Sequence, residues 1–83
     1  MSLEENVKKI LAQTLQLGSR ANGLTNQSML LGALPELDSM AVVTILTSLE
    51  EHFGFIVEDD EISADTFATL GSLTAFVEQK LNG

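Results

Sequence analysis

The residues best placed for chemistry in this chain are Asp38 and Ser39, at the point where an apolar helical run begins. Asp is a favoured residue immediately before a helix, so we expect Ser39 to be the first helical residue. The chain has one His and no Cys, Tyr or Trp, which leaves this serine with few catalytic partners. Ser39 is therefore better suited to receive an attached group than to act as the nucleophile of a triad.

Two other kinds of chemistry are poorly supported. A hydrolase would need His52 to reach Ser39, but their separation along one helix places them about 20 Å apart. The run Glu58–Glu61 is rich in oxygen ligands, yet it lacks the alternating spacing and the glycine of a calcium loop. The lack of Cys excludes disulfides, Cys-ligated zinc and thiol catalysis by the polypeptide. We therefore expect no catalytic residue, no metal site and no enzyme.

The net charge of −8 is unevenly distributed along the chain. No Lys or Arg lies between Ala21 and Gln79. Such an acidic field disfavours nucleic acid and anionic membranes and attracts basic partners. An acidic helical interaction module without a cofactor would also explain this surface, with Asp38 serving only as a helix cap. The acids of this stretch are Glu36, Asp38, Glu50, Glu51, Glu58, Asp59, Asp60, Glu61, Asp65 and Glu78.

The length of 83 residues predicts one small domain over residues 1–83. No stretch approaches the ~18 consecutive apolar residues of a membrane span. The first residues, 1–5, carry acids where a secretory signal would be basic. We expect a monomer in the cytoplasm, a compartment that the lack of Cys also fits.

A first helix is predicted over residues 3–17 and a long loop over residues 18–37. Ser2 and Glu5 have the spacing of a capping box at the start of the helix, and Gly18 is a natural stop. The helix has one apolar face, formed by Leu3, Val7, Ile10, Leu11 and Leu15. In the loop, residues 28–31 could form a short turn, and we expect five apolar side chains to pin it to the core, namely Leu24, Met29, Leu30, Leu31 and Leu34.

A second helix is predicted over residues 39–53, with Asp38 as its N-cap and Gly54 as its end. We assign Val43, Leu46 and Leu49 to its core-facing stripe, with Ile45 and Phe53 beside them. The front of this helix would then present an apolar, uncharged surface formed by Met40, Ala41, Val42, Thr44 and Thr47.

Glu50 and Glu51 lie in the last turn of this predicted helix, where the helix dipole does not favour acids. That mismatch indicates a role in recognition. Downstream, we expect an extended segment at 55–57, an acidic turn at 58–61 and a short helix containing Phe67 and capped by Ser63 or Asp65. Thr69 can cap a last helix, whose apolar residues at helical spacing are Leu70, Leu73, Phe76, Val77 and Leu81.

The predicted fold class is therefore all-α: a small bundle of three main helices plus one short helix, with a long loop between helices one and two. In this order of elements the chain resembles the acyl carrier proteins of the phosphopantetheine-binding family. The likeness rests on Asp38-Ser39-Met40 opening the second helix, on Leu49-Glu50-Glu51-His52-Phe53 closing it, and on Phe67-Ala68-Thr69-Leu70 leading into the last helix. It spans nearly the whole length of the chain.

The resemblance implies that Ser39 carries a 4′-phosphopantetheine arm derived from coenzyme A. The thiol of that arm would supply the nucleophile that a chain without Cys lacks, and the phosphodiester would lie at a helix N-terminus, which favours anions. Asp38 would assist the phosphopantetheinyl transferase, through its magnesium. The carrier would hold acyl groups as thioesters and present them to acyl-activating ligases or synthase enzymes of a fatty-acid-like or specialised pathway, with Met40, Val42, Glu50 and Glu51 as its partner surface.

The sequence departs from many fatty-acid carriers at two positions of the second helix. Those proteins have acids two and five residues after the serine, where this chain has Ala41 and Thr44. An apolar helix front favours a stand-alone carrier of a specialised bacterial pathway, loaded by an acyl-activating ligase. A peptidyl or aryl carrier protein is the alternative within the family.

Overall fold

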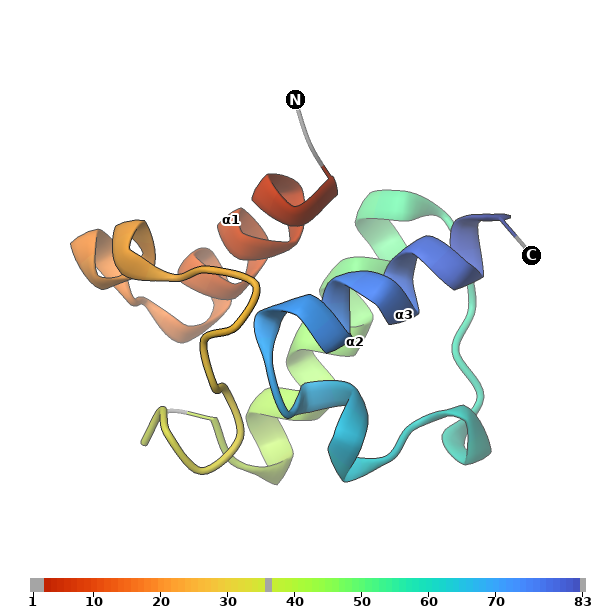
Figure 1. Cartoon of the computed structure of the whole chain (residues 1–83). Helices are drawn as coiled ribbons and strands as arrows, with labels where there is room; N and C mark the ends of the chain where they lie inside the picture. Colours follow the sequence, from red (N-terminus) through yellow and green to blue (C-terminus); the bar gives the residue numbers. More distant parts are fainter. Residues whose placement is uncertain (1–2, 36, 83) are drawn as a thin grey trace.

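The computed structural model describes residues 3–35 and 37–82, without the side chain of Asp59. Three α-helices dominate this part of the chain (Figure 1): α1 (Leu3–Leu15), α2 (Ser39–Phe53) and α3 (Leu70–Asn82). Short 3-10 helices connect them, namely η1 (Gly18–Gly23), η2 (Asp59–Glu61) and η3 (Ala64–Phe67). The described residues form no β-strand, and the all-α prediction is confirmed.

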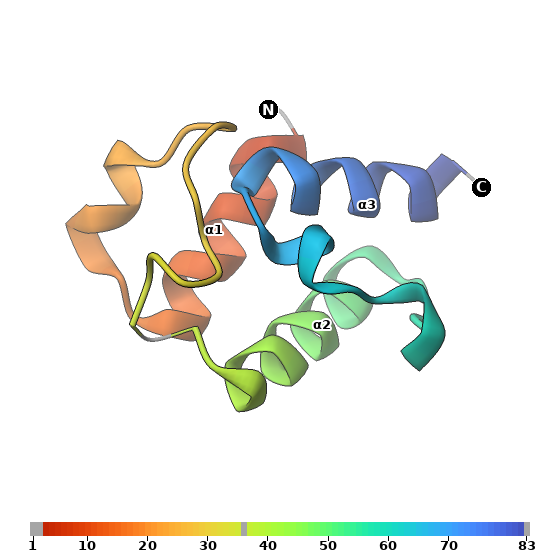
Figure 2. The same ribbon diagram turned by 60° about the horizontal axis from the view of Figure 1, so that its bottom comes forward.

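Helix α1 is the element on which the other two α-helices pack, and η3 packs against α3 (Figure 2). The residues predicted for its apolar face lie toward the core, because their 3–4 residue spacing places them on one side. No polar or charged side chain is buried among the described residues. The core consists of Val7, Ile10, Leu11, Leu15, Leu17, Ala21, Leu30, Leu37, Ile45, Leu49, Phe67, Leu70, Leu73 and Val77.

The first helix ends earlier than predicted. Its last residue is Leu15, and Gln16 adopts the left-handed conformation with φ of 56°. The amide of Leu17 then donates to the carbonyl of Ala12 over 3.0 Å, which closes the helix in the manner of a Schellman motif. Gly18 is therefore not the stop but the first residue of η1, and the predicted cap residue Ser2 lies outside the described residues.

Residues 28–30 form an extended segment and not the predicted turn, and Leu31 is the first residue of a turn that follows. Met29 makes an isolated antiparallel bridge with Thr69, and the amides of Leu30 and Leu31 donate to carbonyls of residues 68 and 67. Side chains alternate along an extended segment, so only every second one can face the core. Leu30 is buried, whereas Met29 and Leu31 are exposed, and the prediction that these two pin the loop was wrong.

Helix α2 has the predicted bounds but a different buried face. Val43 is 58% exposed, whereas Val42 is half-buried and packs against the core. The predictions that Val43 faces the core and that Val42 faces outward were therefore wrong. Ala41, expected at the front of the helix, is also half-buried. The face that packs inward consists of Val42, Ile45, Leu46, Leu49 and Phe53.

The C-terminal part of the chain follows the prediction closely. Residues 55–57 are extended without a partner strand, and Ser63 precedes η3, which contains the buried Phe67. Helix α3 begins after Thr69 and extends to Asn82, although Leu81 is 45% exposed and does not belong to its buried face. None of the helices within residues 3–35 and 37–82 is long and apolar enough to cross a membrane.

Candidate functional site at the start of helix two

The start of α2 is fixed by Asp38, as the sequence predicted. Its backbone is extended, and its Oδ1 atom accepts a hydrogen bond from the amide of Ala41 over 2.8 Å. Its carbonyl accepts the amide of Val42 over 2.9 Å, which is the first hydrogen bond of the helix. Asp38 thus determines where the helix begins and makes Ser39 its first residue.

The chain that leads to Asp38 is anchored to the core. Leu37 is buried, and its amide donates to the carbonyl of Leu34 over 3.0 Å. Leu34 is half-buried, and its own amide donates to the carbonyl of Leu30 over 3.0 Å. The backbone just before Ser39 is therefore anchored to the core, even though a long loop precedes it.

The side chain of Ser39 is available to another molecule. The residue is exposed, and no described residue forms a hydrogen bond with its hydroxyl. The amides of Ser39 and Met40 also have no acceptor among the described residues, as is usual for the first residues of a helix. The first turn of α2 carries no acid. These features suit a phosphate group joined to the Ser39 oxygen, because amides and the helix dipole favour a negative charge there.

The outward face of α2 carries two exposed apolar side chains, Met40 and Val43, beside two threonines. Met40 is 74% exposed, and Val43 lies one turn further along the helix. The hydroxyls of Thr44 and Thr47 donate to the carbonyls of Met40 and Val43, each over 3.0 Å. Because both hydroxyls are occupied by the helix backbone, the two threonines add little free hydrogen-bonding capacity to this surface.

Glu50 has a structural contact that the sequence did not reveal. Its Oε2 atom accepts a hydrogen bond from the amide of Val57 over 2.7 Å, and the residue is half-buried. No local sequence signal predicts this contact, because the chain must first turn back at Gly54 to bring Val57 beside the helix. Glu51, in contrast, is exposed.

A shallow hollow of about 150 Å³ lies beside this face, between α2 and the segment that follows it. Its lining combines apolar and acidic side chains: Val43, Leu46, Thr47, Glu50, Val57, Glu58 and Ile62. Val43 belongs both to the exposed face of α2 and to the edge of this hollow. An apolar partner side chain could contact both at once.

His52 lies far from Ser39 along α2, at the other end of the same helix. It is exposed, and its ring contacts Phe53 edge-on with a centroid separation of 4.7 Å. Across the described ranges, no group of three or more His, Cys, Asp or Glu side chains is arranged to hold a metal ion. The described residues therefore bring no second reactive side chain to Ser39.

The profile of the phosphopantetheine attachment site family matches residues 6–77. A curated acyl carrier protein from Desulforapulum autotrophicum is 33% identical and aligns with 96% of this chain and 99% of its own. Another, from Buchnera aphidicola, is 37% identical over 72% of this chain and 73% of its own. The chain belongs to the acyl carrier protein family.

A solved relative supports the same assignment at the level of structure. The solution NMR structure of a holo acyl carrier protein from Nitrosomonas europaea superimposes with a TM-score of 0.92. The two proteins are 59% identical, and the alignment covers both chains completely. The family is one of carriers, and its cofactor is covalently attached 4′-phosphopantetheine. The exposed serine at the start of α2 fits that group by its hydroxyl, its neighbouring amides and the absence of acids in the first turn.

Proposed function

We propose that Ser39 is the residue to which 4′-phosphopantetheine is attached. The observation that carries this proposal is an exposed, unengaged hydroxyl at the N-terminus of a helix whose start is fixed by Asp38. When bound, the arm supplies a thiol that can hold an acyl group as a thioester. The residues around Ser39 hold the attachment point at the surface and offer amides to the phosphate.

The protein, in this proposal, is a single carrier domain over residues 1–83 that performs no catalysis itself. Its partners are a phosphopantetheinyl transferase and the acyl-activating ligase or synthase enzymes that load and use the arm. Asp38 has two roles: its carboxylate caps α2 and assists the transferase, through the magnesium ion of that enzyme. The cytoplasm is the compartment in which we expect these partners to meet.

The test is modification of the purified apo protein. The protein is incubated with coenzyme A, magnesium and a broad-specificity phosphopantetheinyl transferase, and its mass is then measured. We expect one added phosphopantetheine in the wild type and none in Ser39→Ala. Ser63→Ala is the matched control, since Ser63 is also exposed and also lies at the start of a helical segment, as the residue before η3. Modification that persists in Ser39→Ala, or is absent from the wild type, would refute the assignment.

The partner surface we propose is centred on Val43 and not on Val42, which is half-buried. A partner that approaches Ser39 would meet Met40 and Val43 first, and of the two acids within α2 only Glu51 is exposed, since Glu50 is half-buried and bonded to Val57. Full burial of a valine-sized side chain is worth roughly 1.5–3 kcal/mol, whereas an exposed ion pair is typically worth about 0–1 kcal/mol. Recognition should therefore depend more on apolar contact than on charge.

Transferase kinetics can test this surface, because the transferase must contact the residues beside Ser39. We expect Val43→Asp to lower kcat/KM for arm attachment far more than Glu51→Gln does, and added salt to have only a weak effect. Circular dichroism should show that both variants keep the wild-type helix content, since both side chains are exposed. The apolar surface would be excluded if Glu51→Gln and salt reduced kcat/KM strongly while Val43→Asp left it unchanged.

A further inference from the structure

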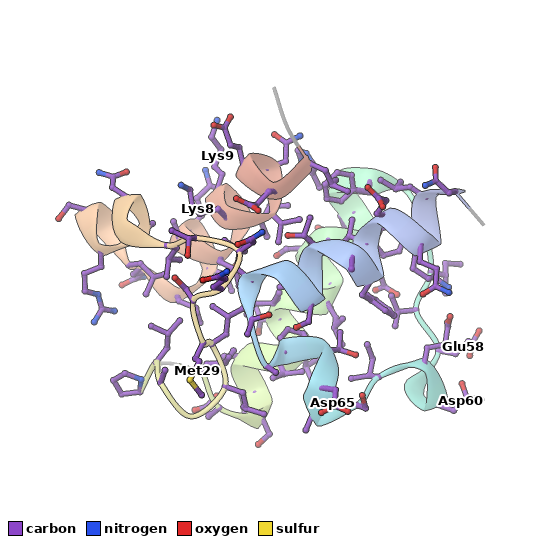
Figure 3. All side chains as sticks on the ribbon, viewed as in Figure 1. Lys8, Lys9, Met29, Glu58, Asp60 and Asp65 are labelled. Atoms are coloured by element: carbon purple, nitrogen blue, oxygen red, sulfur yellow. The ribbon has the colours of Figure 1, made fainter. Side chains whose placement is uncertain are left out.

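The segment from Gly54 to Ile62, hereafter the strap, connects α2 to the region before η3. It leaves the end of α2 and descends beside α3 to η2 at the edge of the molecule (Figure 1). Phe55 and Ile62 are half-buried against the core, while Ile56 is 74% exposed. Glu58 and Asp60, labelled in Figure 3, lie at this outer edge. The strap is thus a largely superficial segment with a few apolar contacts.

Two carboxylates attach the strap to the helices on either side. On the α2 side, Oε2 of Glu50 accepts the amide of Val57 over 2.7 Å. On the α3 side, Nζ of Lys80 donates to both carboxylate oxygens of Glu61, over 2.9 and 2.8 Å. The same Glu61 carboxylate accepts the amide of Glu58 over 2.9 Å, so it also shapes the strap internally. The hydrogen bond from Lys80, followed by that from Glu58, lowers the pKa of Glu61 from its ordinary value.

Hollows lie on both sides of the strap, between these attachments. The hollow of about 150 Å³ beside Val43 lies between the strap and α2. A larger one, of about 380 Å³, lies between the strap and α3 and is lined by Glu61, Phe76, Gln79 and Lys80. The Glu61–Lys80 ion pair borders this second hollow. Beside these hollows, the polar attachments act together with the apolar contacts of Phe55 and Ile62 to hold the strap on the helices.

Lys80 is the sole Lys or Arg after Arg20 in the sequence. It forms a bidentate contact with Glu61, and its side chain is 21% exposed. We propose that the Glu50–Val57 hydrogen bond and the Glu61–Lys80 ion pair form a two-point latch that holds the strap closed and opens as one cooperative unit. Opening would expose the side of the strap that carries Ile62 and uncover Phe76 on α3.

Cooperativity is the part of this proposal that a merely local contact would not produce. If the strap opens as a unit, the two attachments are coupled. Loss of the ion pair must then weaken the Glu50–Val57 hydrogen bond by as much free energy as loss of that hydrogen bond weakens the ion pair, because coupling between two sites is reciprocal. Lys80 contacts Glu61, whereas the Val57 amide is bonded at the opposite helix. Because Glu61 also accepts the amide of Glu58, which neighbours Val57, an effect of Lys80 on the Val57 amide reports opening of the whole strap when the reverse effect, of Glu50 on the Glu61 amide, has the same size.

The experiment is amide-exchange NMR on the full chain, with every variant in the same modification state. We expect Lys80→Gln to speed exchange of the Val57 amide roughly two- to five-fold, in line with the strength of an exposed ion pair. Conversely, Glu50→Ala, which removes the acceptor of the Val57 amide, should speed exchange of the Glu61 amide, which donates to the Glu58 carbonyl over 3.0 Å. Lys9→Gln is the matched control, because it removes the same charge from an exposed position on α1 and should leave both amides unchanged.

A charge exchange separates the ion pair from general effects of substitution. The double variant Glu61→Lys with Lys80→Glu should exchange more slowly at Val57 than either single variant, because it re-forms the ion pair, although it lacks the acceptor of the Glu58 amide. Amides of buried α1 residues, such as Val7 and Leu11, serve as the internal reference for global stability. Unchanged Val57 exchange in Lys80→Gln, or the same acceleration in Lys9→Gln, would overturn the latch. The result does not depend on which serine carries the arm.

Discussion

Helices α2 and α3 both begin with a side-chain cap, but they differ in which hydroxyls and amides are engaged by other described residues. At α3, Thr69 and Ser72 form a reciprocal capping box, in which each amide donates to the other hydroxyl over 3.0 Å. At α2, Asp38 provides the cap and the Ser39 hydroxyl is left without a described partner. A serine therefore stands at both helix starts, but only the Ser39 hydroxyl has no hydrogen-bond partner among the described residues.

The amides of the two helix starts differ in the same way. The first amides of α3, those of Leu70 and Gly71, donate to the carbonyls of Ser28 and Asn26 over 3.0 and 2.8 Å. The corresponding amides of α2 have no acceptor in the described part of the chain. The loop between α1 and α2 thus occupies the N-terminal amides of α3, where an anion could otherwise bind, and leaves those of α2 accessible. One helix start thus serves the fold, and the other is the start at which we propose that the cofactor is attached.

The largest effect we expect concerns the close approach of the loop to α3. A Cβ atom on Gly71 would lie 2.6 Å from the backbone oxygen of Asn26, and relief of that clash would break the hydrogen bond between them. Gly71→Ala should therefore lower the free energy of unfolding by about 1–3 kcal/mol. Urea denaturation measures this. Gly23→Ala is the control, since a Cβ atom there would have no neighbour within 4 Å, and equal stability of the two variants would contradict the close packing.

The two serines should respond differently to the same substitution. Ser72→Ala removes a hydroxyl that accepts the Thr69 amide and donates to the carbonyls of Thr66 and Thr69, so we expect a loss of about 1–2 kcal/mol. Ser39→Ala removes an exposed hydroxyl without a described partner and should change stability by less than about 0.5 kcal/mol. Thermal and urea unfolding of apo proteins provide the comparison. A destabilisation as large in Ser39→Ala as in Ser72→Ala would mean that the two starts are not distinct.

Asp38 allows the cap at α2 to be separated from its charge. Asp38→Ala should cost about 1 kcal/mol, because the Ala41 amide loses its acceptor, whereas Asp38→Asn keeps an acceptor oxygen and should cost only a few tenths. Arm attachment should fall in both variants if the carboxylate itself assists the transferase. Unfolding and modification are measured on the same samples. Full modification of Asp38→Asn would leave Asp38 with a capping role alone.

Charge also distinguishes the starts of α2 and α3, since α2 is capped by a carboxylate and α3 by neutral hydroxyls. The smallest effect that we expect is that of salt on the acids of the chain. The stretch between Ala21 and Gln79 contains acids and no Lys or Arg, and salt screens the repulsion among them. We expect the melting temperature to rise modestly from low to moderate salt near neutral pH. Calorimetry would show this. A melting temperature that falls would mean that contacts weakened by salt, such as Glu61–Lys80, outweigh the repulsion.

The sequence by itself determined the order and most of the bounds of the helices, because these depend on contacts between near neighbours. Asp38 and Gly54 delimit α2 through bonds to residues three and four positions away, and Thr69 opens α3 in the same local way. The prediction for the end of α1 failed because Gln16 adopts a left-handed conformation that is usual for glycine. The candidate site, at a capped helix start, was likewise visible in the sequence.

Only the tertiary structure decided which surfaces these helices present. Val42 and Val43 are equally apolar neighbours. The spacing of Val42 to Ile45, Leu46 and Leu49 favours Val42 for the core, but packing decided how far each valine is exposed, with Val42 half-buried and Val43 outward. The contacts of Glu50 with Val57 and of the loop at Asn26 with Gly71 join residues that approach each other only after the chain has folded. Local chemistry therefore fixes where a helix begins, and long-range packing decides what it exposes.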